Sequence, residues 1–205
     1  MIAALATGLL LGLSCGLAPG PLMALVLAQS LRHGAREGCK TALAPLLTDA
    51  PVILLAWLLA ARAADYRTLF GALSLAGGAF VLYLAVDTFR PAAPSTAAPG
   101  GSPGSWFKGI LTNLLSPHPW LFWLTIGAAT LAKALARSWL AAAAFLASFY
   151  LMLVGSKVAL ALLAAHSRSF LAGRPYRFVM RTLAVLLGLC AMLLFREGWS
   201  RLAAN

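Results

Sequence analysis

The chain has 205 residues, of which 61% are hydrophobic and only 10% are charged. A soluble domain has about 25% charged residues, so this composition excludes an ordinary soluble protein and indicates a polytopic membrane protein. The net charge of +11 lies in short turns between apolar runs, without a stripe of interleaved aromatic residues. Such a distribution is typical of membrane topology control, and we expect no nucleic-acid partner.

Apolar runs follow one another along the whole chain. Each is near or above the roughly 20 residues that cross about 30 Å of hydrocarbon. Such segments must be helical, because in lipid every backbone N–H and C=O needs an internal partner. The sequence therefore predicts an all-α membrane protein with six transmembrane helices. The predicted crossings are 2–31, 41–61, 68–89, 109–132, 138–165 and 182–194, the last extending toward residue 202.

Prolines interrupt the first and the fourth of these runs. Pro19, Gly20 and Pro21 lie inside the first, and Pro117 and Pro119 lie inside the fourth. Each proline removes a backbone N–H, and such gaps are tolerated at membrane depth only when buried in protein or facing a watery cavity. A single proline usually produces only a kink, but matching interruptions in two halves of a chain indicate a transporter's binding site. We expect helices 1 and 4 to be broken beside a polar cavity.

Two charged residues lie well inside predicted crossings, Asp49 in the second and Lys157 in the fifth. Each costs about 2.5–3.5 kcal/mol at a helix centre, so each should face a partner or water. Counted from the nearest loops, both lie about 13–17 Å from one membrane edge, as do Pro21 and Pro117. We expect the two charges to pair, or to compete for a proton or substrate. The alternative for Lys157 is that its long stem reaches back to the membrane surface.

The segment 90–108 is rich in Pro, Gly and Ser and is typical of a flexible linker. It divides the chain into two units, 1–89 and 109–205. Because each unit has three crossings, the second enters the membrane from the opposite side, and the two are predicted to be inverted repeats. The first, third and fifth loops carry nine Lys and Arg residues against six on the other side, which predicts that both termini lie outside the cytoplasm.

The remaining reactive side chains give weaker indications. The three cysteines are widely spaced and form no paired motif, and we expect no metal site, no cofactor and no enzyme active site. His118, which lies between two prolines, is a candidate proton carrier because imidazole exchanges protons near neutral pH. Trp120 follows the second break, where it could line a pocket or serve only packing.

Two stretches carry a family resemblance: APGPLMALVLAQSLRHGAREGCKTALAPLLTD at 18–49, and KGILTNLLSPHPWLFW at 108–123. Both are similar to the lysine exporter (LysE) superfamily of bacterial amino-acid and small-solute exporters, and the similarity extends over nearly the whole chain. Pro19–Pro21 matches the family's proline–glycine–proline of the first helix, and Asp49 matches its second-helix acid. Ser116–His118 takes the place of the family's asparagine–proline–lysine.

The resemblance implies a multi-pass protein of the bacterial inner membrane, so the termini that the charge distribution places outside the cytoplasm are expected to be periplasmic. It also implies export of amino acids or related solutes by alternating access, with protons as the coupling ion and often as a homodimer. The chain departs from the family at the predicted pocket, where Leu22 replaces a polar residue and Thr48 a glycine. A lipid-like substrate is therefore an alternative, and an intramembrane enzyme is a further one that lacks a visible nucleophile and base. The candidate substrate- or ion-binding residues are Pro19, Gly20, Pro21, Thr48, Asp49, Asn113, Ser116, Pro117, His118, Trp120 and Lys157.

Overall fold

The computed structural model describes residues 1–60, 67–89, 104–167 and 174–203, and within these ranges the chain is helical without strands. The predicted all-α class is confirmed. Residues 90–103 of the predicted linker lie outside the described residues, and residues 105–108 are already helical. The elements are α1 (Ile2–Leu17), α2 (Pro21–His33), α3 (Ala35–Ala42), α4 (Ala44–Ala60), α5 (Arg67–Phe89), α6 (Ser105–Leu115), α7 (Pro117–Phe122), the π-helical turn η1 (Trp123–Gly127), α8 (Ala128–Arg137), α9 (Trp139–Ser167) and α10 (Arg174–Ala203).

Several of these elements are long and apolar enough to cross a membrane. Four segments of the described chain pass this test, and α1 with α2 makes a fifth if the pair, bent by 66°, counts as one span. The apolar part of α5 is shorter, from Ser74 to Phe89. The chain is therefore a multi-pass membrane protein, while the sixth crossing and the inverted repeat remain predictions. The four segments are 35–55, 117–137, 139–167 and 177–203.

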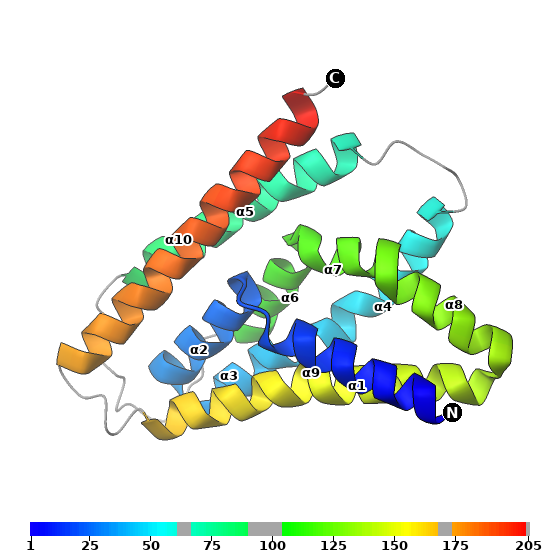
Figure 1. The fold of residues 1–205 in the computed structure, drawn as a ribbon. Coiled ribbons are helices and arrows are strands. Elements are labelled where there is room, and N and C mark those ends of the chain that lie inside the picture. The colour runs from blue at the N-terminus through cyan, green and yellow to red at the C-terminus, as the bar shows by residue number, and fades with distance from the viewer. Residues whose placement is uncertain (61–66, 90–103, 168–173, 204–205) are drawn as a thin grey trace.

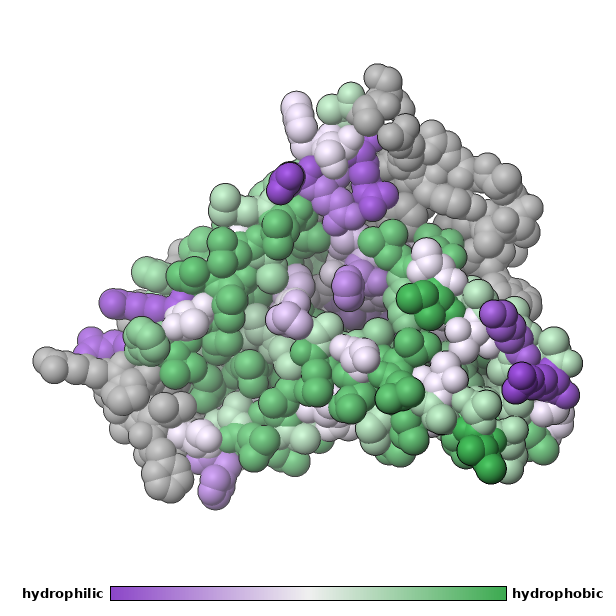
Figure 2. All heavy atoms as spheres, in the orientation of Figure 1, coloured by the Kyte–Doolittle hydropathy of each residue, from purple (hydrophilic) through white to green (hydrophobic). Residues whose placement is uncertain are grey.

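The outer surface has the composition that lipid contact requires. Leu10, Leu151 and Met192 are 68%, 64% and 67% exposed, and they belong to three different helices. Figure 2 shows hydrophobic residues over most of the visible face, with hydrophilic residues mainly at its margins and in a central hollow. Apolar side chains at this exposure are costly in water and favourable in hydrocarbon. The apolar outer surface therefore supports the conclusion that the protein is embedded in a membrane.

Two long helix pairs frame the molecule, with α5 along α10 and α1 along α9 (Figure 1). The first pair packs through an apolar core that includes Val81, Leu84 and Leu187. A second core surrounds Trp123 and Phe149 and joins α4, η1, α8 and α9 with α1. The elements α2, α3, α4, α6 and α7 lie between the two pairs (Figure 1), so both interruptions of the chain fall in the interior.

Small residues allow α1 to approach α9 closely. A Cβ atom added at Gly12 would overlap the carbonyl oxygen of Phe149, and one at Gly8 or Gly16 would overlap a serine hydroxyl of α9. The repeat of glycine every four residues places all three on one face of α1, as expected for close packing of membrane helices. This close approach brings the face of α9 that carries Lys157 to the end of α1.

We expect Gly12→Ala to destabilise the protein by about 1–3 kcal/mol, because an extra carbon at a full contact forces the two backbones apart. Gly155→Ala is the matched control, since a Cβ at Gly155 meets nothing within 4 Å. There the substitution should be neutral or stabilise by up to about 1 kcal/mol. Thermal unfolding in detergent measures both variants, and equal midpoints would contradict the packing described for α1 and α9.

Candidate functional site

The first break separates α1 from α2. Residues 18–20 are not helical, and Gly20 is fully extended with φ −163° and ψ −179°. Pro21 is the first residue of α2, a position where the missing N–H has no helical partner to lose. Pro19, in contrast, lacks the N–H that would bond to the carbonyl of Cys15 in a continuous helix. The chain thus ends one helix and begins another at a bend of 66°.

The second break, between α6 and α7, is shorter. Ser116 alone is non-helical, with φ −79° and ψ 130°, and Pro117 is the first residue of α7. The Trp120 indole N–H donates to the carbonyl oxygen of Leu114 at 2.9 Å, so the side chain spans the interruption. Both predicted breaks are therefore present, with a proline at the first position of the following helix in each.

The two breaks face one cavity of about 240 Å³, whose wall also includes parts of α4, α9 and α10. Figure 2 shows a hollow near the position of α7 in Figure 1, with hydrophilic residues inside a hydrophobic surround. Two of the predicted residues, Thr48 and Trp120, are buried but do not line the cavity. The predicted residues that do line it are Pro19, Gly20, Pro21, Asp49, Asn113, Ser116, Pro117, His118 and Lys157.

Asp49 lies at the cavity with three neutral hydrogen-bond donors. Its Oδ1 accepts from the Asn113 side-chain amide at 3.1 Å. Its Oδ2 accepts from the Trp123 indole at 3.3 Å and from the Tyr150 hydroxyl at 3.4 Å. The Asn113 amide also donates to the Thr48 hydroxyl at 2.6 Å, so Thr48 positions the amide from behind the cavity wall. These donors stabilise a carboxylate without neutralising its charge.

Lys157 does not pair with Asp49, although both side chains belong to the described part of the chain and line the cavity. Its ammonium donates instead to the carbonyl oxygens of Cys15, at 3.2 Å, and Gly16, at 2.9 Å, in the last turn of α1. The predicted ion pair is therefore absent. Lys157 is 4% exposed, so its stem does not extend to the surface either. Lys157 bonds to α1 because the first break leaves carbonyl oxygens at the end of this helix without helical donors.

Sequence reasoning missed several residues of the cavity wall. Phe149 and Leu153 lie eight and four residues before Lys157, and helical periodicity places all three on one face of α9. This four-residue spacing could have predicted that Phe149 and Leu153 face the cavity together with Lys157. Glu197 of α10 also lines the cavity, and it forms an ion pair with Arg201 at 2.7 Å. No local pattern connects Glu197 with the breaks, because only the packing of α10 brings it there.

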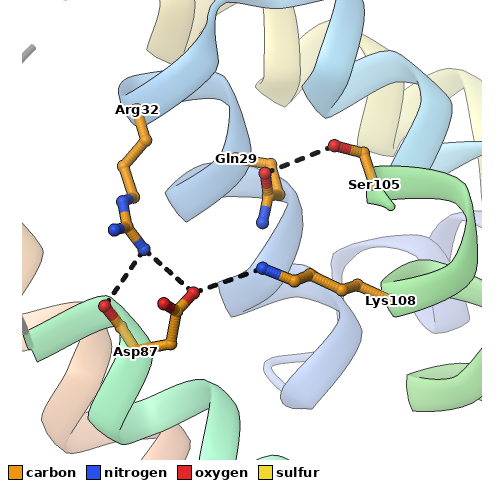
Figure 3. Close-up of polar contacts among 5 residues, drawn as sticks. All are labelled: Gln29, Arg32, Asp87, Ser105 and Lys108. Atoms are coloured by element: carbon orange, nitrogen blue, oxygen red, sulfur yellow. Dashed lines mark hydrogen bonds and ion pairs between the residues drawn. The ribbon is translucent and has the colours of Figure 1, made fainter. Parts of the chain in front are cut away.

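A cluster of polar residues joins three elements at a distance from the cavity (Figure 3). Asp87, near the end of α5, forms ion pairs with Arg32 at 3.1 Å and with Lys108 at 3.3 Å. Beside them, the Ser105 hydroxyl donates to the Gln29 side-chain oxygen at 3.4 Å. This Asp87 cluster ties the ends of α2 and α5 to the start of α6. On α2 its members Gln29 and Arg32 lie eight and eleven residues beyond Pro21, or roughly 12–16 Å along the helix.

An all-helical membrane protein with two interrupted helices around a cavity that contains buried charged groups has the features of a transporter. Residues 13–198 match the family model described as LysE type translocator, and the chain belongs to this family. The family consists of membrane transporters for the export of small solutes rather than of enzymes. Comparison with curated proteins and with solved structures gave no significant match.

We expect Asn113→Leu to destabilise the protein by about 1–3 kcal/mol, because it removes a donor from a buried carboxylate. In an Asp49→Asn background the same change should cost less, with a coupling energy of about 1 kcal/mol. A double-mutant cycle on unfolding free energies measures this coupling. Thr130→Ala serves as the control partner, since the Thr130 hydroxyl of α8 bonds to the carbonyl of Ile126 in η1. Additive effects of Asn113→Leu and Asp49→Asn would refute the contact.

Proposed function

We propose that this protein is a proton-coupled exporter of amino acids or related small solutes in the bacterial inner membrane. The observation that carries the proposal is the meeting of both broken helices with Asp49 at one cavity. Broken helices at membrane depth are tolerated where they line a cavity, and they mark the binding site of many secondary transporters. Membership of a translocator family supports the same function.

The cavity offers complementary groups for a substrate with an amine and a carboxylate. The first turn of α2, Pro21 to Met23, lines the cavity with the positive end of the helix dipole. A substrate carboxylate is stabilised at such an end by backbone N–H groups that lack helical acceptors. Asp49, on the opposite element α4, is suited to an ammonium group. The wall between them is mainly apolar, so it also admits the side chain of an amino acid.

Asp49 is the group that we propose to exchange a proton. Its three donors are neutral, and no cation within 4.0 Å in the described chain balances its charge. A buried carboxylate in this state gains by binding either a proton or a cationic substrate, because both remove an unbalanced charge from a medium of low dielectric constant. Competition between the two at one carboxylate couples proton entry to substrate release.

In many transporters alternating access arises from the movement of two similar halves against each other. The packing of this chain supports a division into two such halves. The contact of α1 with α9 has a counterpart in the contacts of α6 and η1 with α4, and the α5–α10 pair would map onto itself. This pattern is what an exchange of units 1–89 and 109–205 produces. We propose six crossings, the last three inverted relative to the first three, with 90–108 as their linker and both termini periplasmic. A homodimer is compatible with the apolar outer surface.

The Asp87 cluster supports a closed side in this state. It joins α2 and α5 of the first unit to the first turn of α6, directly before the second unit, at the edge that the charge distribution assigns to the cytoplasm. Buried polar and apolar side chains of α2, including Leu25, Val26 and Gln29, fill the space between this edge and the cavity. We propose that export requires the cluster to open and re-form in each cycle.

A lipid-like substrate remains the second candidate. Phe122, Trp123, Phe149 and Leu153 give the cavity a large apolar wall, and Leu193 lines it while being 62% exposed. An acyl chain could enter where the wall reaches the outer surface. Metabolite profiling of a deletion strain against an overexpressing strain separates the two, because only a water-soluble substrate accumulates inside the deletion strain.

We expect Asp49→Asn to reduce gradient-driven export in inverted vesicles by more than tenfold, because amide cannot take up the coupling proton. Exchange of substrate across the membrane without a gradient should survive to a larger extent, which distinguishes coupling from folding. Lys133→Gln is the control for charge removal, since Lys133 is exposed on α8 and does not line the cavity. Export by Asp49→Asn at the wild-type rate would exclude proton coupling at this residue.

We expect Asp87→Asn to increase the exposure of the cavity to the cytoplasm, because both ion pairs that close this edge lose their anion. Cys15 lines the cavity and reports on its accessibility once Cys39 and Cys190 are replaced by serine. A membrane-impermeant thiol reagent applied to the cytoplasmic face should label Cys15 at least threefold faster in the variant. Unchanged labelling from that face would remove the Asp87 cluster from the proposed cycle.

A further inference from the structure

The C-terminal end of α1 has the chemistry of a cation site. Cys15 and Gly16 lie in its last turn, and their carbonyls would bond to the N–H groups of residues 19 and 20 in a continuous helix. Residue 19 is proline and has no N–H, and Gly20 is extended. Two carbonyl oxygens therefore converge at the negative end of a helix dipole, in the interior of a membrane protein. A positive charge is the partner that such an end favours.

The ammonium of Lys157 occupies this position. It donates to the carbonyl of Cys15 at 3.2 Å and to that of Gly16 at 2.9 Å, and the side chain is 4% exposed. The glycine face of α1 makes this possible, because it brings the α9 backbone close enough for the lysine stem to span the gap. Asp49 lines the same cavity and adds a negative charge to the surroundings. The amine thus contacts two oxygen atoms of the kind that bind hard cations.

Carbonyl oxygens at the ends of interrupted helices coordinate the sodium ion in sodium-coupled secondary transporters. Here the same kind of ligand set holds a side-chain ammonium. We propose that the end of α1 is a monovalent-cation site that the Lys157 ammonium fills, so that sodium has no place in the transport cycle. The site itself is independent of the proposed exporter function, whereas the consequence for coupling rests on that function.

Removal of the amine tests the site directly. Lys157→Ala leaves both the carbonyl oxygens and a volume for a small ion, whereas Lys157→Met fills the volume with an uncharged side chain. We expect sodium chloride, compared with N-methylglucamine chloride at equal ionic strength, to raise the melting temperature of purified Lys157→Ala by about 2–4 °C. The wild-type protein and Lys157→Met should show no difference between the two salts. Lys157→Ser provides a second cavity-forming variant.

The outcomes divide clearly. Equal melting temperatures in both salts for folded Lys157→Ala and Lys157→Ser would overturn the proposal, and so would a sodium effect of the same size in the wild-type protein. If neither cavity-forming variant survives purification in N-methylglucamine, their recovery in sodium gives the same readout, and recovery in neither salt counts against the site. Wild-type export at equal rates in the two salts tests the consequence for coupling. If the wild-type protein shows no export in either salt, the proposed function is refuted and the melting result is unaffected.

Discussion

The structure depends on one constraint, which is that backbone polar groups inside a membrane must find partners within the protein. Prolines at positions 19 and 117 remove donors from two helices at this depth. Side chains bond to carbonyls that the breaks leave without helical donors: the Lys157 ammonium to Cys15 and Gly16 at the end of α1, and the Trp120 indole to Leu114 at the end of α6. The two breaks border the same cavity.

This constraint explains why much of the architecture could be predicted from the sequence. Apolar runs of membrane-spanning length predict helices because no alternative satisfies the backbone in lipid. Pro19, Pro21 and Pro117 predict the interruptions, because each proline removes a backbone N–H and its ring clashes with the preceding turn. Pro51, in contrast, is accommodated inside α4. The depth of Asp49 follows from counting residues along a helix of fixed rise. These inferences use local chemistry or one-dimensional spacing, and the structure shows the corresponding elements.

The contacts could not be predicted in the same way, because they depend on how helices pack. Asp49 and Lys157 share a layer, and their opposite charges predicted a pair, but the end of α1 offers the lysine two carbonyls that only the folded arrangement reveals. Thr48 has the right depth yet lies behind Asn113, where it positions an amide rather than facing the cavity. Glu197 lies far in sequence from the two breaks whose cavity it lines, and Asp87 lies far in sequence from its partners Arg32 and Lys108. No sequence motif identifies either residue.

The central claim is that both breaks border one water-accessible cavity, which has Asp49 in a mainly apolar wall. A single measurement addresses it: labelling of Gly20→Cys and Ser116→Cys by a small charged thiol reagent in native membranes, with the three natural cysteines replaced by serine. A side chain fits at Gly20, where a Cβ meets nothing within 4 Å, and Ser116 lines the cavity. The account predicts that both positions react, while Leu151→Cys on the apolar outer surface does not. Unreactive thiols at both breaks would contradict it.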